Sequence, residues 1–179
     1  DIQPAMADGR FWKKGDLFLS IRNLSLIALY RPATGEILWW KIGPWRFQHD
    51  VSILDDHRIS VFDNNTLMGY PDERVNGHNR LLVHDLSSGA TSSPWERGFA
   101  ANRIATRAQG RGTPLANGDA MIEETEQGRL VRMSPQGAVR WRYISADSAE
   151  RRMALSWARY LDPTTDGPAI QATVNAKCS

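Results

Sequence analysis

The chain has 179 residues, with 22 Lys and Arg against 20 Asp and Glu, so its formal net charge is +2. A charge this close to neutral argues against a strongly basic nucleic-acid-binding surface, and we expect no nucleic acid among its partners. The one cysteine, Cys178, excludes an internal disulfide and a cluster of Cys and His ligands, and we expect neither a metal nor a cofactor. No apolar run approaches the roughly 18–20 residues needed to span a bilayer.

Short strands are expected from residue 16 to residue 144. The segments are rich in β-branched or aromatic residues, and turn residues bound most of them. This pattern predicts an all-β fold. In chain order the segments are DLFLSIR (16–22), SLIALYR (25–31), EILWWKI (36–42), VSIL (51–54), RISVFD (58–63), RLLVHDL (80–86), DAMIEET (119–125), RLVRMS (129–134) and AVRWRYI (138–144).

A helical period of useful length occurs only near the C-terminus, in SAERRMALSWARYL (148–161). Its apolar stripe consists of Ala149, Met153, Leu155, Trp157 and Tyr160. Ser148 or Asp147 is expected to cap the helix. We therefore predict a short docking helix over 147–161, followed by an extended tail over 162–179.

A repeated unit connects the strands. RPATGEILWW, DLSSGATSSPW and SPQGAVRWRY each contain a glycine turn and then a strand that ends in Trp or in Trp-Arg-Tyr. Their glycines, Gly35, Gly89 and Gly137, lie about fifty residues apart, which is typical of β-propeller blades. A β-sandwich is the alternative, because it also has turns every 8–12 residues or so.

Residues 1–146 hold three to four such blades, whereas propellers close with about four to eight. An open arc leaves strand edges exposed. We therefore expect this chain to be the C-terminal portion of a larger, six-bladed propeller. The upstream part of the same chain, or another chain, is expected to complete the ring; the start at Asp1, without Met, agrees with this interpretation.

Several motifs resemble the bacterial arylsulfotransferase family. They are SIRNLSLIALYRPATGEILWWKIG, FQHDVSIL, SVFDNN, TRAQGRGTPLANGDAMIEETEQGRLVRMSPQGAVRWRYI and WARYL. The resemblance covers about residues 1–161 and is carried most specifically by the order of Ser-x-Arg-Asn, Gln-His-Asp and Phe-Asp-Asn. It implies a periplasmic or secreted β-propeller, with any membrane anchor in a segment outside this sequence.

The resemblance also implies the reaction. Family members transfer a sulfuryl group from an aryl sulfate to a phenol through a sulfated histidine, without a nucleotide donor. By the matching motifs, His49 is the nucleophile and Arg22 holds the sulfuryl oxygens, so both side chains are expected to meet at one mouth of the channel. The family's His-x-Asn motif matches no residues here, because its place lies immediately before Asp1.

Other residues are weighed from their local sequence. Asn64 is the residue of the Asp-Asn-Asn turn expected to face the site, although turn formation alone explains this triplet. Arg111 lies among glycines that permit close approach to a ligand, and Trp45 is expected near the aromatic substrate. Asp50 should point away from His49 in an extended strand and is expected to have a structural role, holding a turn or a backbone N–H, without a direct part in the chemistry.

Further ionisable residues have weaker claims. Glu123 and Glu124 are adjacent, so only one can face inward, where it could orient Arg111 or act as a base. The other histidines are expected in an exposed turn (His57), in a loop (His78) and within a sheet (His84).

Two other functions remain open from the sequence. A catalytically silent propeller could serve as a binding or scaffold subunit for a periplasmic or membrane-associated protein. A quinoprotein is suggested by the TG-x-x-x-W turn at residues 34–39, but the adjacent-cysteine pair of those enzymes cannot exist with one cysteine. A His-x-Asn encoded just ahead of Asp1 would favour the enzyme over the scaffold.

Overall fold

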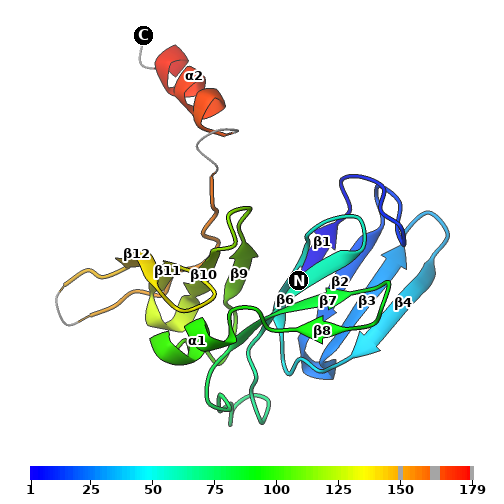
Figure 1. The fold of residues 1–179 in the computed structure, drawn as a ribbon, viewed down its shortest axis with the longest axis horizontal. Coiled ribbons are helices and arrows are strands. Elements are labelled where there is room, and N and C mark those ends of the chain that lie inside the picture. Colours follow the sequence, from blue (N-terminus) through cyan, green and yellow to red (C-terminus); the bar gives the residue numbers. More distant parts are fainter. Residues whose placement is uncertain (149–150, 162–165, 178–179) are drawn as a thin grey trace.

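Three antiparallel sheets of four strands follow one another along the chain (Figure 1). The structure is a computed structural model, and it describes residues 1–148, 151–161 and 166–177. Blade 1 consists of β1 (Ile2–Pro4), β2 (Leu17–Ile21), β3 (Leu26–Arg31) and β4 (Glu36–Ile42). Blade 2 consists of β5 (His49–Ile53), β6 (Arg58–Asp63), β7 (Arg80–Asp85) and β8 (Thr91–Ser92). Blade 3 consists of β9 (Arg111–Pro114), β10 (Ala120–Glu124), β11 (Arg129–Met133) and β12 (Val139–Ile144).

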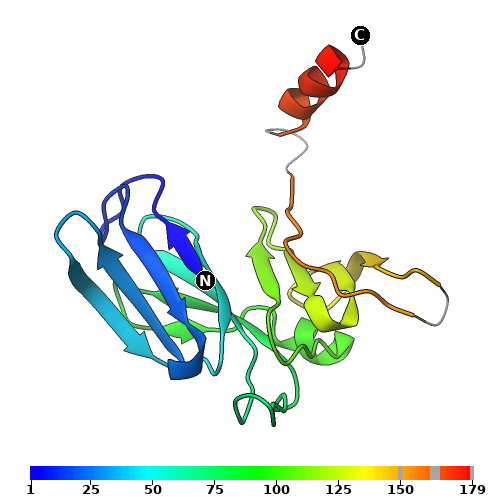
Figure 2. The same cartoon turned by 180° about the vertical axis from the view of Figure 1, so that it is seen from behind.

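The blades are joined through their first strands. β1 contacts β5, and β5 in turn contacts β9. The last strands, β4 and β12, lie on opposite sides of the molecule, with β1 and β9 between them (Figures 1 and 2). The sheets therefore form an arc around a shared inner region, and the predicted all-β partial propeller is confirmed.

Two apolar cores lie between the blades. The core between blades 1 and 2 includes Phe18, Ile27, Leu29, Val51, Ile59 and Val61. The core between blades 2 and 3 includes Phe62, Leu81, Ile122, Val131 and Met133, together with Phe99 of the short helix α1 (Glu96–Asn102). Side chains alternate between the faces of a strand, so the neighbours Val61 and Phe62 of β6 enter different cores. Blade 2 is thus packed on both faces.

The repeated glycine occupies the same place in every blade, at the turn before the last strand. Gly35, Gly89 and Gly137 have φ values of 74°, 72° and 92°. These left-handed conformations are open to glycine at little cost. The repeat seen in the sequence therefore marks the turn between the third and fourth strands.

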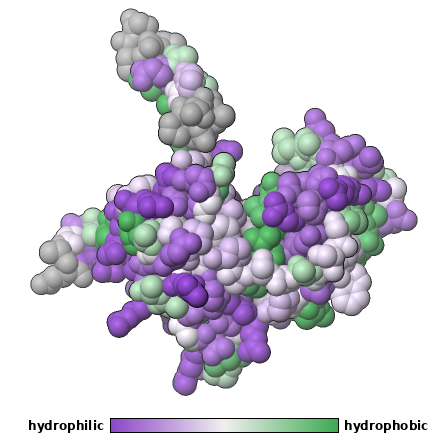
Figure 3. All heavy atoms as spheres, in the orientation of Figure 1, coloured by the Kyte–Doolittle hydropathy of each residue, from purple (hydrophilic) through white to green (hydrophobic). Residues whose placement is uncertain are grey.

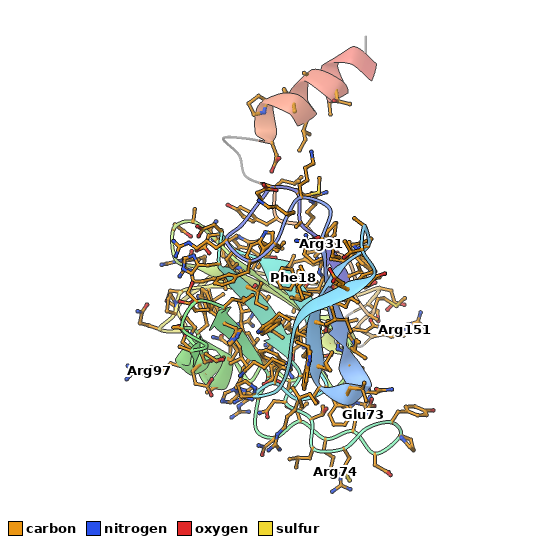
Figure 4. All side chains as sticks on the ribbon, turned by 90° about the vertical axis from the view of Figure 1, so that its right-hand side faces the viewer. Phe18, Arg31, Glu73, Arg74, Arg97 and Arg151 are labelled. Carbon is orange, nitrogen blue, oxygen red and sulfur yellow. The ribbon has the colours of Figure 1, made fainter. Side chains whose placement is uncertain are left out.

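A long connection, residues 64–79, joins β6 to β7. It lies at the end of the molecule opposite the C-terminal helix, where Figure 4 labels Glu73 and Arg74. Phe18, labelled in the same view, lies between the sheets and is fully buried.

The helix predicted over 147–161 is wrong for residues 151–161, which have no regular secondary structure apart from an isolated bridge between Ala146 and Arg152; residues 149–150 lie outside the described residues. In this segment the backbone N–H groups of Leu155 and Ala158 bond to blade 3 instead of to a preceding helical turn. The predicted extended tail is also wrong in part, because α2 (Gly167–Lys177) is helical and projects away from the blades (Figure 1). Pro168 fits the first turn of α2, where its missing N–H costs no hydrogen bond. No helix among the described residues is long and apolar enough to cross a membrane.

Candidate active site

One cavity is lined by residues at the start of the first strand of each blade. The first residue of β5, His49, pairs with Phe62, and the first residue of β9, Arg111, pairs with Glu123. Asp1 holds the corresponding position in blade 1, directly before β1. The cavity has a volume of about 220 Å³ and is lined by Asp1, His49, Asp50, Gln109, Gly110, Arg111, Glu123, Ser156 and Trp157.

Asn64 fixes the tautomer of His49. The Nδ2 of Asn64 donates to the carbonyl oxygens of Thr106 and Gln109, at 3.1 and 2.8 Å, so its Oδ1 must be the atom that faces the imidazole. That Oδ1 lies 2.7 Å from Nδ1 of His49, which therefore carries the proton. The other ring nitrogen, Nε2, is unprotonated and accepts a long bond of 3.3 Å from the Gln109 N–H. His49 thus presents an unprotonated nitrogen beside the cavity.

The surroundings keep this imidazole neutral. Burial lowers the pKa of His49 below its ordinary value of 6.5, because a charged ring is poorly solvated there. The bond to Asn64 favours the charged form and offsets part of this effect, whereas the nearby Arg22 charge lowers the pKa further. A neutral imidazole with an unprotonated nitrogen is a competent nucleophile.

A bulge in β5 places Asp50 at the same cavity. The strand register shifts between His49 and Val51, and Asp50 has a left-handed φ of 47°. The prediction that His49 and Asp50 point apart is wrong for this reason, since both line the cavity. The predicted structural role is confirmed, because the Asp50 carboxylate accepts the Gly112 N–H at 3.1 Å and a bond from Nε of Arg111 at 3.1 Å. Burial raises the pKa of Asp50, and these two partners counter the shift.

Arg111 and Glu123 form the blade 3 side of the cavity. The guanidinium of Arg111 lies 5.0 Å from the centre of the Trp157 ring, a cation–π distance. Glu123 is 2% exposed, and its carboxylate accepts the Thr125 hydroxyl and the Ala158 N–H. Glu124 does not line the cavity and instead pairs with Arg129, so only one of the two adjacent glutamates faces inward, as predicted.

The whole arc from β2 to β12 lies within one family match. The family model described as arylsulfotransferase (ASST) matches residues 6–146. The chain belongs to the arylsulfotransferase family. The resemblance seen in the sequence is thereby confirmed. No curated protein sequence matches the chain.

Arg22 lies beside the cavity and not on its wall, contrary to the expectation that it meets His49 at one mouth. It follows β2, the second strand of its blade, and not an inner strand. Its guanidinium pairs with Glu73 at 2.5 Å and lies 5.3 Å from the centre of the Phe47 ring. Its Nε is buried without a hydrogen-bond partner among the described residues. Arg22 is near enough to lower the pKa of His49.

The structure contradicts the prediction that Trp45 lies near the aromatic substrate. Trp45 is 1% exposed, belongs to the core between blades 1 and 2, and does not line the cavity. Its ring packs edge-on against His84, with ring centres 5.8 Å apart. The sequence FQHD suggested proximity to the site because Trp45 and His49 are close in the chain. The turn between them instead directs the indole into the core.

The remaining histidines lie away from the cavity. His84 is buried in β7, and its Nδ1 is 2.9 Å from the Thr91 hydroxyl. His78 in the long connection lies 3.3 Å from the Glu96 carboxylate. His57 forms a cluster with Asp55 and Asp56, the one group of metal-ligand type found among the described residues. Its carboxylates pair with arginines, Asp55 with Arg58 and Asp56 with Arg10, so the cluster is already neutralised.

Trp157 and Ser156 are cavity residues that the sequence did not predict. They were assigned to a helix because apolar residues in this segment recur at helical spacing. Gln109 was also missed, although it lies two residues before Arg111 in the glycine-bearing stretch QGRG. Its φ of 58° and the following Gly110 turn the chain so that the Gln109 N–H faces His49.

Proposed function

We propose that this protein transfers a sulfuryl group from an aryl sulfate to a phenol, with Nε2 of His49 as the nucleophile. The observation that supports this most strongly is the His49–Asn64 pair. The bond to Asn64 holds the proton on Nδ1, burial lowers the pKa so that the ring stays neutral, and Nε2 lies unprotonated beside a cavity with a long 3.3 Å bond from the Gln109 N–H. Family membership supplies the class of reaction.

In the first step, the Nε2 lone pair forms a bond to sulfur while the bond from sulfur to the aryl oxygen breaks. The electron pair of that bond leaves with the phenolate. The ring then carries a positive charge and its attached SO3 group a negative one, so the adduct is neutral overall. Asn64 stabilises this state, because its Oδ1 accepts from the Nδ1–H of the charged ring.

In the second step, the oxygen of the acceptor phenol attacks sulfur and the N–S bond breaks. The acceptor loses its proton, the first phenolate gains one, and His49 returns to the neutral form. No atom or charge is left over. As in phosphoryl transfer, positioning and electrostatics supply most of the rate enhancement in such a displacement.

Arg111 and Arg22 are the proposed partners of the sulfuryl oxygens. A guanidinium presents several donors in a plane, which suits a tetrahedral oxyanion. Arg111 lines the cavity, and Arg22 carries a buried Nε without a hydrogen-bond partner among the described residues. Since Glu73 holds the Arg22 guanidinium, we propose that the sulfuryl group competes with Glu73 for it.

We also propose that further blades cover the free face of blade 1. In the strand register, Ile21 is opposite Leu26 and Leu26 is opposite Ile42, and the next row contains Trp40. Ile42 is 61% exposed and Trp40 60%. Figure 3 shows apolar side chains in green on the side where blade 1 lies. An apolar sheet face of this kind suits the packing of another blade, from the upstream part of the chain or from another chain.

Family membership further supports a periplasmic or secreted location, where aryl sulfates and phenols would be the small-molecule partners.

Steady-state kinetics test the proposed reaction. With 4-nitrophenyl sulfate as donor and phenol as acceptor, double-reciprocal plots should give parallel lines, as expected of ping-pong kinetics. The His49→Gln variant should lose at least about a thousand-fold in turnover, whereas His57→Gln, a change at the surface, should not. Intersecting lines together with an active His49→Gln variant would rule out the covalent route.

A further inference from the structure

Trp157 is a large apolar side chain that stays exposed at the wall of the His49 cavity. Its exposed fraction is 76%. A single exposed aromatic residue is common on protein surfaces and by itself says nothing about function. The position of Trp157 is informative because the segment around it is held in place on both sides.

We call this segment, residues 153–161, the C-terminal strap. Before Trp157, the Leu155 N–H donates to the Thr125 carbonyl at 3.1 Å. After it, the Ala158 N–H donates to the Glu123 carboxylate at 2.5 Å. Glu123 is almost completely buried, so a carboxylate on the cavity wall is committed to holding the strap. The ring of Tyr160 adds a third attachment, 5.7 Å from the guanidinium of Arg132.

The backbone of Trp157 is held in an unfavourable conformation. Its φ is 64°, in the left-handed region that favours glycine. A bulky side chain stays in this region only where the surrounding contacts determine it, and such residues cluster at functional sites. The strap contacts meet this condition and direct the indole toward the cavity.

Arg111 fixes the indole from one side. Its guanidinium lies 5.0 Å from the centre of the Trp157 ring, while its Nε bonds to Asp50 at 3.1 Å. The cation and the aromatic surface are therefore presented together, at the cavity that His49 also lines. A ligand with a flat ring and an anionic group matches this pairing.

We propose that Trp157 is a specificity-determining residue, whose exposed indole surface holds the aryl ring of the donor and of the acceptor. The sulfuryl group then lies toward Arg111 and His49. The cavity volume of about 220 Å³ is below the roughly 300–1,000 Å³ of pockets for drug-sized ligands, which suits a single ring. The assignment of the anionic group as a sulfuryl group rests on the proposed function.

Binding measured without catalysis tests this proposal. Benzenesulfonate has the ring and the anionic group but no sulfuryl group that can be transferred, and methanesulfonate lacks the ring. Isothermal titration of the purified protein should give an affinity for benzenesulfonate that falls about ten-fold or more in Trp157→Ala, with methanesulfonate binding unchanged. Trp157→Phe should recover most of the affinity for benzenesulfonate.

Two further variants separate ring contact from strap structure. Trp157→Gly removes the indole, and glycine adopts the left-handed backbone conformation without strain, so this variant should leave the strap undistorted. It should still bind benzenesulfonate as weakly as Trp157→Ala, because both variants lack the ring. Trp141→Ala removes another partly exposed tryptophan, on β12, that does not line the cavity, and it should bind like the unaltered protein.

The outcomes distinguish this proposal from the proposed function. If the ring preference is lost in Trp157→Gly but no sulfuryl transfer occurs in the unaltered protein, Trp157 keeps its assigned role and the enzyme activity is refuted. If transfer occurs and Trp157→Gly binds benzenesulfonate as tightly as the unaltered protein, the role of Trp157 is refuted and the activity stands. Absence of any benzenesulfonate binding to the unaltered protein also overturns the role of Trp157.

Discussion

At the scale of single residues, the chemistry of His49 depends on a neutral partner. Many reactive histidines are oriented by a carboxylate, which would add negative charge next to an anionic sulfate. Asn64 orients the ring as firmly, through a 2.7 Å bond, without that charge. Its neighbours in the Asp-Asn-Asn turn have other tasks: Asp63 accepts the N–H groups of Arg46 and Asn65. The sequence alone could not assign these separate roles to the three residues, because Asp and Asn both favour turns.

Replacing Asn64 by Ala should slow sulfuryl transfer by about 100-fold, since His49 can then place its proton on Nε2. The full loss for a wrong tautomer at a catalytic histidine can reach about 10⁴-fold. The same change removes the Asn64 donor from the Gln109 carbonyl oxygen, and one of two side-chain donors from the Thr106 carbonyl oxygen, which Asn79 still serves. It should reduce the free energy of unfolding by about 1–3 kcal/mol. Initial rates of 4-nitrophenolate release and urea unfolding measure the two effects.

Asn65→Gly is the matched control for Asn64→Ala. Asn65 donates to the Asn76 and His78 carbonyl oxygens, makes no bond to His49, and has a left-handed φ of 51° that glycine accepts. It should reduce stability by a similar amount and leave the rate nearly unchanged. Equal rate losses in the two variants would show that Asn64 acts through stability alone.

The lowered pKa of His49 predicts the pH dependence of transfer. Because protonation occupies Nε2, the rate should stay constant as pH falls from 8 to 6.5 and should decline only below the ordinary histidine value. The free energy of unfolding should decrease as pH falls from 6.5 to the lowered pKa of His49, because over that interval the unfolded chain binds a proton that the buried ring does not, and it should level off below the lowered pKa. Single-turnover rates between pH 5 and 8 test this. A decline centred at or above 6.5 contradicts the assignment of a neutral buried His49.

At the scale of elements, short backbone connections position the site. At the bulge, the Asp50 carboxylate accepts the Gly112 N–H and so links β5 to β9 by a hydrogen bond. The turn after η2 (Thr125–Gln127) supports the C-terminal strap. Gly128 ends that turn with a φ of 57°. Its N–H donates to the Thr125 carbonyl, and its own carbonyl accepts the Ser145 N–H. A side chain at this glycine would meet the strap directly.

Gly128→Ala should therefore destabilise blade 3 and displace the strap. The new Cβ would lie 2.1 Å from the carbonyl oxygen of Met153, which is backbone and cannot move away alone. We expect a loss of at least about 2 kcal/mol, since the left-handed conformation alone costs roughly 1–2 kcal/mol for a residue other than glycine. Thermal unfolding measures the loss, and a weaker affinity for benzenesulfonate reports the displaced strap.

The control is Gly118→Ala, at a glycine with a φ of 86° and open space around its missing side chain. This variant should show the left-handed cost without the clash and should keep its affinity for benzenesulfonate. If the two variants behave alike, contact between Gly128 and the strap is not important for the site.

The sequence predicted most strands but not the elements that form the cavity wall. The nine predicted segments correspond to strands in blades 1 to 3, because their alternation and turn residues are local properties. β1, β8 and β9 were not among these segments because each is only two to four residues long, and β9 includes Gly112 and Pro114. The strap was taken for a helix because its apolar spacing is helical. Its hydrogen bonds to Thr125 and Glu123, which are distant in sequence, decide its structure instead.

At the scale of the whole molecule, blade 2 couples the two cores. β6 contributes Val61 to one core and Phe62 to the other, and His49 lies at the start of the adjacent strand. Damage to either core should therefore reach the site. The propeller class could be predicted because the glycine turn repeats once per blade. The meeting of His49 with Gln109 and Arg111 could not, because it depends on how blade 2 packs on blade 3.

Phe18→Ala and Phe62→Ala test this coupling. Both side chains are fully buried, in different cores, and each truncation should reduce the free energy of unfolding by about 3–5 kcal/mol. If the blades unfold together, both changes should shift one common transition in urea, followed by tryptophan fluorescence and by circular dichroism. Tyr70→Ala, at a residue that is 86% exposed, should leave that transition in place. Two separate transitions would show that the cores are independent.

The central claim is that His49 carries the sulfuryl group, and the most direct measurement is to detect it there. The protein is incubated with 4-nitrophenyl sulfate and no acceptor, quenched, digested with trypsin and analysed by mass spectrometry. The peptide FQHDVSILDDHR, residues 47–58, contains both His49 and His57, so fragmentation must locate the added SO3 group. We predict one SO3 group on His49, present in the His57→Gln variant and absent from His49→Gln. An SO3 group on another residue, or none while 4-nitrophenolate is still released, would contradict it.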